Sequence, residues 1–351
     1  MDIGFEQGPI RPPSEAKSLL IRATRNCPWN KCRFCNTYAD TKFAIRNSGE
    51  VKNDIYRAAK IARDLAEYSR EEGEEGVITA RIVQAVFDRQ ELYNEAYRAI
   101  ALWLYYGGEQ VFIQDADSLT MKTVDMIAIL RCLQETFPAV KRITTYCRSK
   151  TAARKPLAEL ELLREAGLSR IHVGMETGSD TLLKFINKGV TALEHIEGGQ
   201  KIKAAGISLS EYVMPGLGGQ TWSHEHAVET ARVINSINPD FLRLRSLHIT
   251  AFTPLAKMTQ KGTFMPLGEE DVLREIREFI LELEGISTTI VSDHMFNLLE
   301  ELEGTLPADK TKLLATIDRY FSLSEEDRRI FRRGRRRGVY RSMDELAAES
   351  N

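Results

Sequence analysis

Three cysteines gather in one short stretch of this chain, although the whole sequence contains only five. Residues 27–35 read Cys-Pro-Trp-Asn-Lys-Cys-Arg-Phe-Cys. Thiolates packed into one loop are suited to a soft metal centre such as an iron–sulfur cluster. Three sulfur ligands also leave one coordination position open, and an open position is where a metal centre can do chemistry. The stretch therefore predicts an iron–sulfur site with a free position.

Other interpretations of these cysteines remain open. They could form an incomplete zinc knuckle or serve as small core residues, but structural zinc sites normally close with four ligands, and no His or Cys follows at ligand spacing. A non-catalytic iron–sulfur protein would also carry such a loop. Five cysteines with three in one cluster argue against a disulfide framework and favour a reducing compartment.

Length and charge limit the classes of partner. The 351 residues suffice for one large core with a smaller appended region. Because 48 Lys and Arg nearly balance 50 Asp and Glu, no global field attracts nucleic acid or an anionic membrane. Since the sequence has neither a signal-like N-terminus nor a long apolar span, we expect a cytoplasmic protein without a membrane partner.

The elements that must position the cysteines alternate between strand and helix patterns. This alternation predicts a parallel sheet. The first strand leads straight into the cysteines, at the strand end where parallel barrels keep their chemistry. The predicted strands are residues 18–24, 111–115, 142–148, 170–175, 208–214 and 241–249.

The strand signal disappears after Pro254, and only helical patterns follow. The sequence is therefore divided into an irregular lead-in (1–17), a barrel (18–255) and a C-terminal helical region (256–351). The helices predicted in the last region are residues 269–284, 292–302, 310–321 and 325–333.

Four side chains are candidates from their positions alone. Arg243 and Arg245 lie two residues apart on the last predicted strand, so both face the same side, where one could hold a carboxylate; ion pairing under the helices is the equal alternative. Cys147 ends the third strand, where a thiol could donate a hydrogen atom to substrate, although a lone cysteine is usually a small core residue. His294 lies on a polar stripe of the helix predicted over 292–302. This stripe is either a solvated face or a surface that closes over substrate, where His294 could donate a proton.

A dense run of arginines precedes the C-terminus. It could meet RNA or an acidic carrier protein, and a solvated terminal helix is the alternative. The run consists of Arg332, Arg333, Arg335, Arg336 and Arg337.

The cysteine stretch resembles the iron–sulfur loop of the radical S-adenosylmethionine (SAM) superfamily, with Phe34 at the aromatic position before the last cysteine. Its first gap holds four residues, where three are commonest in the family. Further segments that resemble those of the superfamily follow in the same order over residues 18–255. They include residues 171–180, Ile-His-Val-Gly-Met-Glu-Thr-Gly-Ser-Asp, and residues 214–219, Met-Pro-Gly-Leu-Gly-Gly. The former segment is similar to the branch that contains oxygen-independent coproporphyrinogen oxidases and anaerobic magnesium-protoporphyrin cyclases.

The resemblance implies a fold and a reaction. The fold is an α/β, incomplete (βα)6 TIM-like barrel with a C-terminal helical extension. Cys27, Cys32 and Cys35 would hold a [4Fe–4S] cluster that chelates SAM. An external one-electron donor such as flavodoxin or ferredoxin would reduce it, and the deoxyadenosyl radical so formed would remove hydrogen from an unidentified substrate. No cobalamin-binding domain fits in the 26 residues before the first cysteine.

The resemblance also implies contacts to SAM. Glu176 would inherit the SAM contact at the end of the fourth strand, and Met214 and Gly216 would lie beside the adenine. Asp115 or Asp117 would contact SAM after the second strand, unless Asp117 caps the next helix. A tRNA-modifying member of the superfamily, which grips RNA through its arginine run, is the alternative function.

Overall fold

The structure is a computed structural model that describes residues 3–89 and 93–349. In this part of the chain the main element is a curved sheet of eight strands. In sheet order the strands are β1 (Leu19–Arg22), β4 (Gln110–Gln114), β5 (Arg142–Cys147), β6 (Leu168–Glu176), β7 (Ser208–Val213), β8 (Phe241–Leu244), β9 (Thr289–Val291) and β10 (Gly304–Thr305). Neighbours from β1 to β9 are parallel, and β10 is antiparallel to β9.

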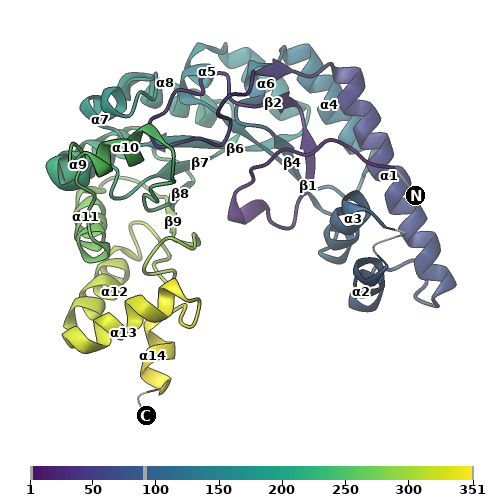
Figure 1. The fold of residues 1–351 in the computed structure, drawn as a ribbon. Helices are drawn as coiled ribbons and strands as arrows, with labels where there is room; N and C mark the ends of the chain where they lie inside the picture. Colours follow the sequence, from purple (N-terminus) through teal and green to yellow (C-terminus); the bar gives the residue numbers. More distant parts are fainter. Residues whose placement is uncertain (1–2, 90–92, 350–351) are drawn as a thin grey trace.

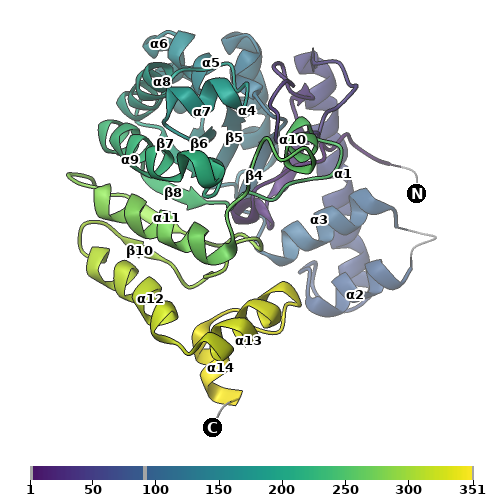
Figure 2. The ribbon, with the colours of Figure 1, turned by 60° about the vertical axis from the view of Figure 1, so that its left-hand side comes forward.

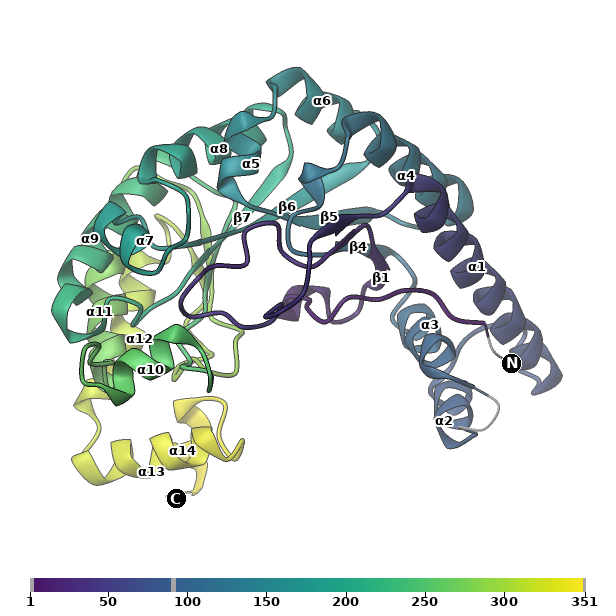
Figure 3. The same cartoon turned by 45° about the horizontal axis from the view of Figure 1, so that its top comes forward.

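Helices connect the parallel strands and cover the convex face of the sheet, as crossover connections require. The helices of the described residues are α1 (Ser48–Glu71), α2 (Ala80–Asp88), α3 (Glu95–Tyr105), α4 (Thr123–Thr136), α5 (Ser149–Arg154), α6 (Leu157–Glu165), α7 (Asp180–Phe185), α8 (Ala192–Ala204), α9 (Gly219–Ile237), α10 (Pro254–Gln260), α11 (Glu269–Glu282), α12 (Lys310–Ser322), α13 (Glu325–Arg336) and α14 (Met343–Glu349), of which the last three follow the final strand. Figure 3 shows α1, α4, α6, α8 and α9 as an outer arc, with the N-terminal chain in dark purple on the concave side.

Side chains alternate between the two faces of each strand, so each face has its own composition. The face under the helices carries the main hydrophobic core, to which Ile143 and Ile171 belong. The concave face, called the inner face below, carries rings that touch from strand to strand. The ring centroids of Phe112 and Tyr146 are 5.0 Å apart, and those of Tyr146 and His172 are 5.9 Å apart.

The lead-in closes one end of the inner face. Its short 3-10 helix (Pro13–Glu15) buries the carboxylate of Glu15. One oxygen of Glu15 lies 3.1 Å from Nε2 of His172, and the other lies 3.0 Å from Arg142 at the start of β5. The amino-terminal ends of the strands are therefore plugged, and any site on the inner face opens toward their carboxyl ends.

The predicted α/β class and incomplete TIM-like barrel are confirmed, and all six predicted strands are present. The helix predicted over residues 292–302 is wrong. Instead, β9 joins the sheet beside β8, and irregular chain follows up to β10. The side chain of Asn297 donates to the carbonyl of Leu244 (2.8 Å) and accepts from the amide of Ser246 (2.9 Å), so it is buried by tertiary contacts. The sheet thus continues beyond residue 255, and the strand predicted to end at residue 249 ends at Leu244.

The last helices lie at one end of the molecule. Helices α12, α13 and α14, which range from yellow-green to yellow, extend away from the sheet in Figures 1 and 2. The predicted helices at residues 310–321 and 325–333 are confirmed as α12 and α13. Within the described ranges, no helix combines the length and apolar character needed to cross a membrane.

Candidate functional site

The cysteines lie in a loop at the carboxyl end of β1. The ribbon of β2 (Thr24–Arg25) and β3 (Ala44–Ile45) pairs the two ends of this loop. Asn26 and Asn30 adopt left-handed backbone conformations, with φ of 68° and 46°, which Asn tolerates better than most residues. The amide of Asn30 donates to Sγ of Cys27 over 3.4 Å. The fold therefore presents the cysteines on a closed loop at the barrel mouth.

The cysteine loop crosses the barrel mouth and docks on the chain that follows β6. The amide of Arg33 donates to the carbonyl of Ile186 (2.8 Å), and Nε1 of Trp29 donates to the carbonyl of Asn187 (2.6 Å). On the other side, the amide of Leu255 donates to the carbonyl of Arg33 over 2.9 Å. Elements from β1, β6 and the region after β8 thus meet at this loop.

Glu176 and Lys188 form an ion pair beside the cysteine loop. Glu176 ends β6 with φ of 68°, and its Oε1 lies 2.9 Å from Nζ of Lys188. Burial raises the pKa of Cys32 to about 11, and the nearby Lys188 ammonium opposes that rise. Burial lowers the pKa of Lys188, but Glu176 and Cys32 outweigh this effect, so its pKa is raised. The sequence pattern gives Lys188 no role, because nothing in its spacing indicates that it pairs with Glu176.

Gly174 makes room for this ion pair on the inner face. A Cβ atom at Gly174 would lie 2.5 Å from Oε1 of Glu176 and 3.4 Å from Nζ of Lys188. Any larger side chain would therefore displace the carboxylate.

An apolar wall continues from the cysteine loop to the end of β7. Met214 and Leu217 are buried against Ile186, and Phe34 packs against this cluster. The predicted candidates Phe34 and Met214 are thus neighbours. Gly216 has φ of 85°, and its amide donates to Oε1 of Glu275 over 2.6 Å, so this amide is already engaged within the protein.

The two aspartates after β4 hold protein loops in place. Asp115 is fully buried and bonds Arg22 (2.7 Å), the hydroxyl of Tyr38 and the amide of Asn26. These contacts hold the chain on both sides of the three cysteines, at Asn26 and at Tyr38. The geometry does not favour the predicted SAM contact of Asp115, because its carboxylate oxygens are already bonded.

Asp117 supports the turn between β5 and α5. It accepts from Thr151 (2.6 Å) and from the amide of Arg148 (3.3 Å), and burial raises its pKa to about 6. It does not cap the next helix, because the 3-10 helix Ser118–Thr120 has no side-chain cap. The cap interpretation of Asp117 is therefore wrong, its described contacts are structural, and its SAM contact stays a prediction.

Arg243 and Arg245 differ in availability. Arg243 is buried and bonds Asp293 (2.9 Å) and Ser210 (3.2 Å), so its charge is already paired. Arg245 is exposed just after β8, and its side chain forms no hydrogen bond or ion pair with any described residue. Its guanidinium is close enough to lower the pKa of Tyr146 somewhat, against the larger effect of burial.

His294 lies near Arg245, in a loop rather than on the predicted helix stripe. Burial and the Arg245 charge lower its pKa to about 4. The ring of Phe296 separates it from His248: Phe296 stacks on His248 at 4.1 Å and lies 5.1 Å from His294. This group forms one rim of the barrel mouth.

Cys147 does not face the barrel mouth. Strand alternation turns its thiol under the helices, into the main hydrophobic core, while its neighbour Tyr146 faces inward. Burial raises the pKa of Cys147 well above its usual value. The predicted hydrogen-atom donor is therefore a core residue.

The arginine run mostly anchors the C-terminal helices. Arg335 bonds Glu300 (2.8 Å) and three backbone carbonyls, Arg336 bonds Glu269 (2.7 Å), and Arg332 pairs with Glu270. Arg333 and Arg337 are exposed, and within the described ranges their side chains form no hydrogen bond or ion pair.

The three cysteines of the loop lie in one region of the barrel mouth. Within residues 3–89 and 93–349, no three His, Cys, Asp or Glu side chains are close enough to hold one metal ion. An iron–sulfur cluster does not require this closeness, because each cysteine binds a different iron atom. The Cys27 and Cys35 thiols are near enough to raise the pKa of Cys32, so the three sulfurs share one region.

Comparison with known families identifies the chain. Residues 21–231 match the family described as the radical SAM superfamily. The chain therefore belongs to the radical SAM superfamily, which confirms the predicted enzyme class. Members of this superfamily use a [4Fe–4S] cluster and SAM and need a reductant.

Individual relatives differ in what their names describe. The chain is 24% identical over 281 residues to a tRNA uridine(34) acetyltransferase of Methanocaldococcus jannaschii, covering 76% of this chain and 49% of that protein. It is 31% identical over 141 residues to the heme chaperone HemW of Bacillus subtilis, covering 38% and 36%. The chain thus spans about half the length of the first relative.

A solved structure of a radical SAM enzyme aligns with part of this chain. Coproporphyrinogen III oxidase (HemN) from Escherichia coli aligns with a TM-score of 0.47 and 15% identity, covering 73% of this chain and 50% of that one. Because the relatives carry different activities, the predicted branch of the superfamily stays a prediction.

Proposed function

We propose that this enzyme holds its [4Fe–4S] cluster through Cys27, Cys32 and Cys35 and removes hydrogen from a substrate bound on the inner face. The observation that carries the proposal is the meeting of the cysteine loop with the Glu176–Lys188 pair at the barrel mouth. When bound, the cluster and SAM supply radical chemistry for hydrogen removal.

Residues around the loop have distinct roles in this proposal. Lys188 places a positive charge near the thiolates and fixes the carboxylate of Glu176. Glu176 accepts hydrogen bonds from the amino group or ribose hydroxyls of SAM. The apolar wall that contains Phe34 and Met214 excludes water from the adenosyl group, and the turn at Gly216 completes this wall.

We assign the binding of an anionic group at the mouth to Arg245 rather than to Arg243. The charge of Arg243 is neutralised by Asp293, whereas Arg245 is exposed and its side chain has no hydrogen-bond or ion-pair partner among the described residues. A guanidinium of this kind suits a carboxylate, either that of SAM or that of an acidic substrate. His294 lies beside it and, with a pKa of about 4, is a neutral hydrogen-bonding group at neutral pH.

Anaerobic reconstitution with iron and sulfide tests the proposal. After addition of dithionite and SAM, we expect 5′-deoxyadenosine as a product. C32A should lose iron and product formation, because one cluster ligand is removed. C132A is the matched control, since Cys132 is buried in α4, outside the cysteine loop. Full iron content in C32A would contradict the proposed ligand set.

A tRNA substrate is the second candidate function. The observation that favours it is the alignment over 76% of this chain with a relative named tRNA uridine(34) acetyltransferase. In the arginine run, Arg333 and Arg337 are the candidates for phosphate contacts. If RNA binds there, replacing both with Ala should reduce the salt dependence of RNA affinity by about two phosphate contacts. An unchanged salt slope would exclude this grip.

A further inference from the structure

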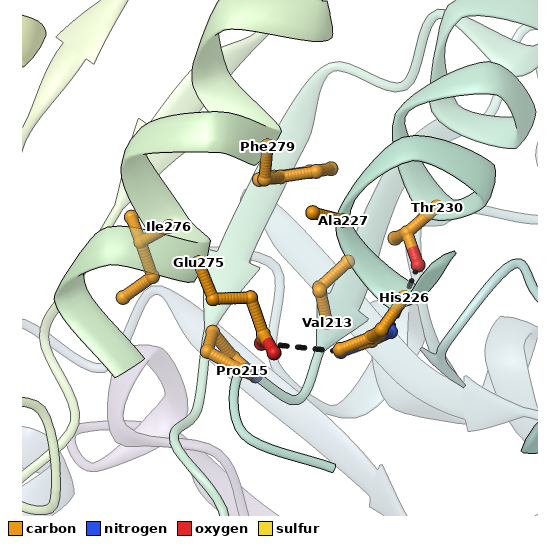
Figure 4. A pocket seen from close by; sticks show the side chains of 8 residues that line it. All are labelled: Val213, Pro215, His226, Ala227, Thr230, Glu275, Ile276 and Phe279. Carbon is orange, nitrogen blue, oxygen red and sulfur yellow. Dashed lines mark hydrogen bonds and ion pairs between the residues drawn. The ribbon is translucent and has the colours of Figure 1, made fainter. Parts of the chain in front are cut away.

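A small buried pocket lies between β7, α9 and α11, outside the site described above. Two of its lining side chains, His226 of α9 and Glu275 of α11, point toward one another (Figure 4). They have only 1% and 3% of their surface exposed, and Nε2 of His226 lies 3.7 Å from Oε1 of Glu275. Because buried polar groups are unfavourable without partners, their hydrogen bonds indicate their role.

His226 connects the turn after β6 with the turn after β7. Its Nε2 lies 3.0 Å from the carbonyl oxygen of Met214, and its Nδ1 lies 2.9 Å from the hydroxyl of Thr177 and 3.1 Å from that of Thr230 on the same helix. A carbonyl oxygen only accepts hydrogen bonds, so Nε2 carries the hydrogen and Nδ1 can accept from a threonine hydroxyl, such as that of Thr177. One buried ring thereby fixes the spacing of two turns that are far apart in the sequence.

Glu275 holds the same region from the opposite side. Its Oε1 accepts from the amide of Gly216 (2.6 Å), and its Oε2 accepts from the hydroxyl of Ser223 (2.6 Å). Hydrogen bonds to a carboxylate are stronger than those between neutral groups. Glu275 therefore fixes the left-handed turn at Gly216 against the start of α9.

We propose that His226 and Glu275 are positioning residues for SAM binding. The inference rests on the proposed function, in which Glu176, Met214 and Gly216 line the SAM site. Thr177 directly follows Glu176, while Met214 and Gly216 are themselves bonded by the pair. Neither His226 nor Glu275 reaches the site; each acts through the turns that it holds.

SAM binding and cluster binding depend on different contacts of the protein. The cysteine loop docks on Ile186, Asn187 and Leu255, none of which bonds to His226 or Glu275 in the described ranges. Loss of the buried pair should thus weaken SAM binding and leave the iron content unchanged. A merely structural role would lower thermal stability without changing the affinity of the folded protein for SAM.

His226 variants of the full chain test this role, each reconstituted anaerobically. H226L removes the hydrogen bonds of both ring nitrogens, whereas H226Q retains an amide that can donate toward Met214. The matched control is H224L, because His224 also pairs with a glutamate across α9 and α11: it lies 2.6 Å from Glu278, but on the exposed surface. Iron content and melting temperature are measured first, and the Kd for SAM is then measured by equilibrium dialysis.

We expect H226L to raise the Kd for SAM at least about tenfold at wild-type iron content, the size of effect typical of residues that orient ligand-binding groups. H226Q should recover most of the affinity, and H224L should match the wild type. T177V should weaken binding modestly, and T177V/H226L should be no weaker than H226L, because the two changes remove the same hydrogen bond.

A wild-type Kd in H226L, or an equal loss in H224L, would overturn the positioning role, as would a loss of iron in parallel with affinity. If H226L does not fold, T177V carries the test, and a wild-type Kd in T177V overturns the role. If wild-type protein loads iron but binds no SAM, the proposed function itself fails and the positioning role fails with it.

Discussion

The ion pair between Lys188 and Glu176 allows a quantitative prediction. Its two charged atoms are 2.9 Å apart, and the side chains are only 12% and 13% exposed. At an effective dielectric constant of about 20, the attraction at this distance is about 6 kcal/mol. Desolvation of both ions offsets much of it, but removing one partner leaves the other charge buried, which typically lowers stability by about 3–5 kcal/mol.

We therefore expect Lys188→Met to lower the free energy of unfolding by about 3 kcal/mol, near the lower end because the pair is not completely buried. Glu176→Gln should cause a similar loss. The double variant should lose clearly less than the sum, because no charge is left alone, which gives a coupling energy of about 2–3 kcal/mol. Urea unfolding of the anaerobic apo-protein, followed by circular dichroism, measures all four species.

A matched surface pair provides the control. Lys141 and Glu109 are 2.6 Å apart but have 73% and 44% of their side-chain surface exposed. The same cycle, with Lys141→Met and Glu109→Gln, should give a coupling energy of less than about 1 kcal/mol. Strict additivity at Lys188 and Glu176, or equal coupling in both cycles, would refute the reasoning that burial makes the first pair strong.

Three further predictions concern other parts of the chain. Burial lowers the pKa of His195 from 6.5 to about 3, so below pH 6.5 the unfolded chain binds a proton that the folded chain does not. Between pH 7 and pH 5 the wild type should therefore lose about 2 kcal/mol of stability relative to H195Q. Parallel curves of stability against pH for the two proteins would contradict this. A Cβ at Gly189 would lie 2.3 Å from the Trp29 ring, so G189A should reduce the iron content after reconstitution. The control G262A is also at positive φ but has open space around it, so it should keep the wild-type iron content. Equal iron content in the two variants would contradict the clash. R335A should lower the melting temperature, because this guanidinium bonds three backbone carbonyls; an unchanged melting temperature would show that these bonds contribute little.

The sequence by itself determined the features that depend on local patterns. Cysteine spacing needs no tertiary information, and it predicted an iron–sulfur loop at residues 27–35. Strand and helix periodicity placed six strands, because burial on a sheet and on a helix leaves different repeats. The strand β9 was missed since three residues are too few to form a periodic pattern, and its place beside β8 comes from pairing.

Tertiary structure decided which side chains are available to chemistry. The strand ending in Tyr146 and Cys147 was predicted correctly, yet its facing was not, because neighbouring residues on a strand point to opposite sides. Arg243 and Arg245 read alike in the sequence, but Asp293, which lies 50 residues away from Arg243, pairs only with the former. Likewise, Lys188 meets Glu176 because the chain after β6 folds back past α7, and His226 meets Thr177 because the sheet places the ends of β6 and β7 side by side.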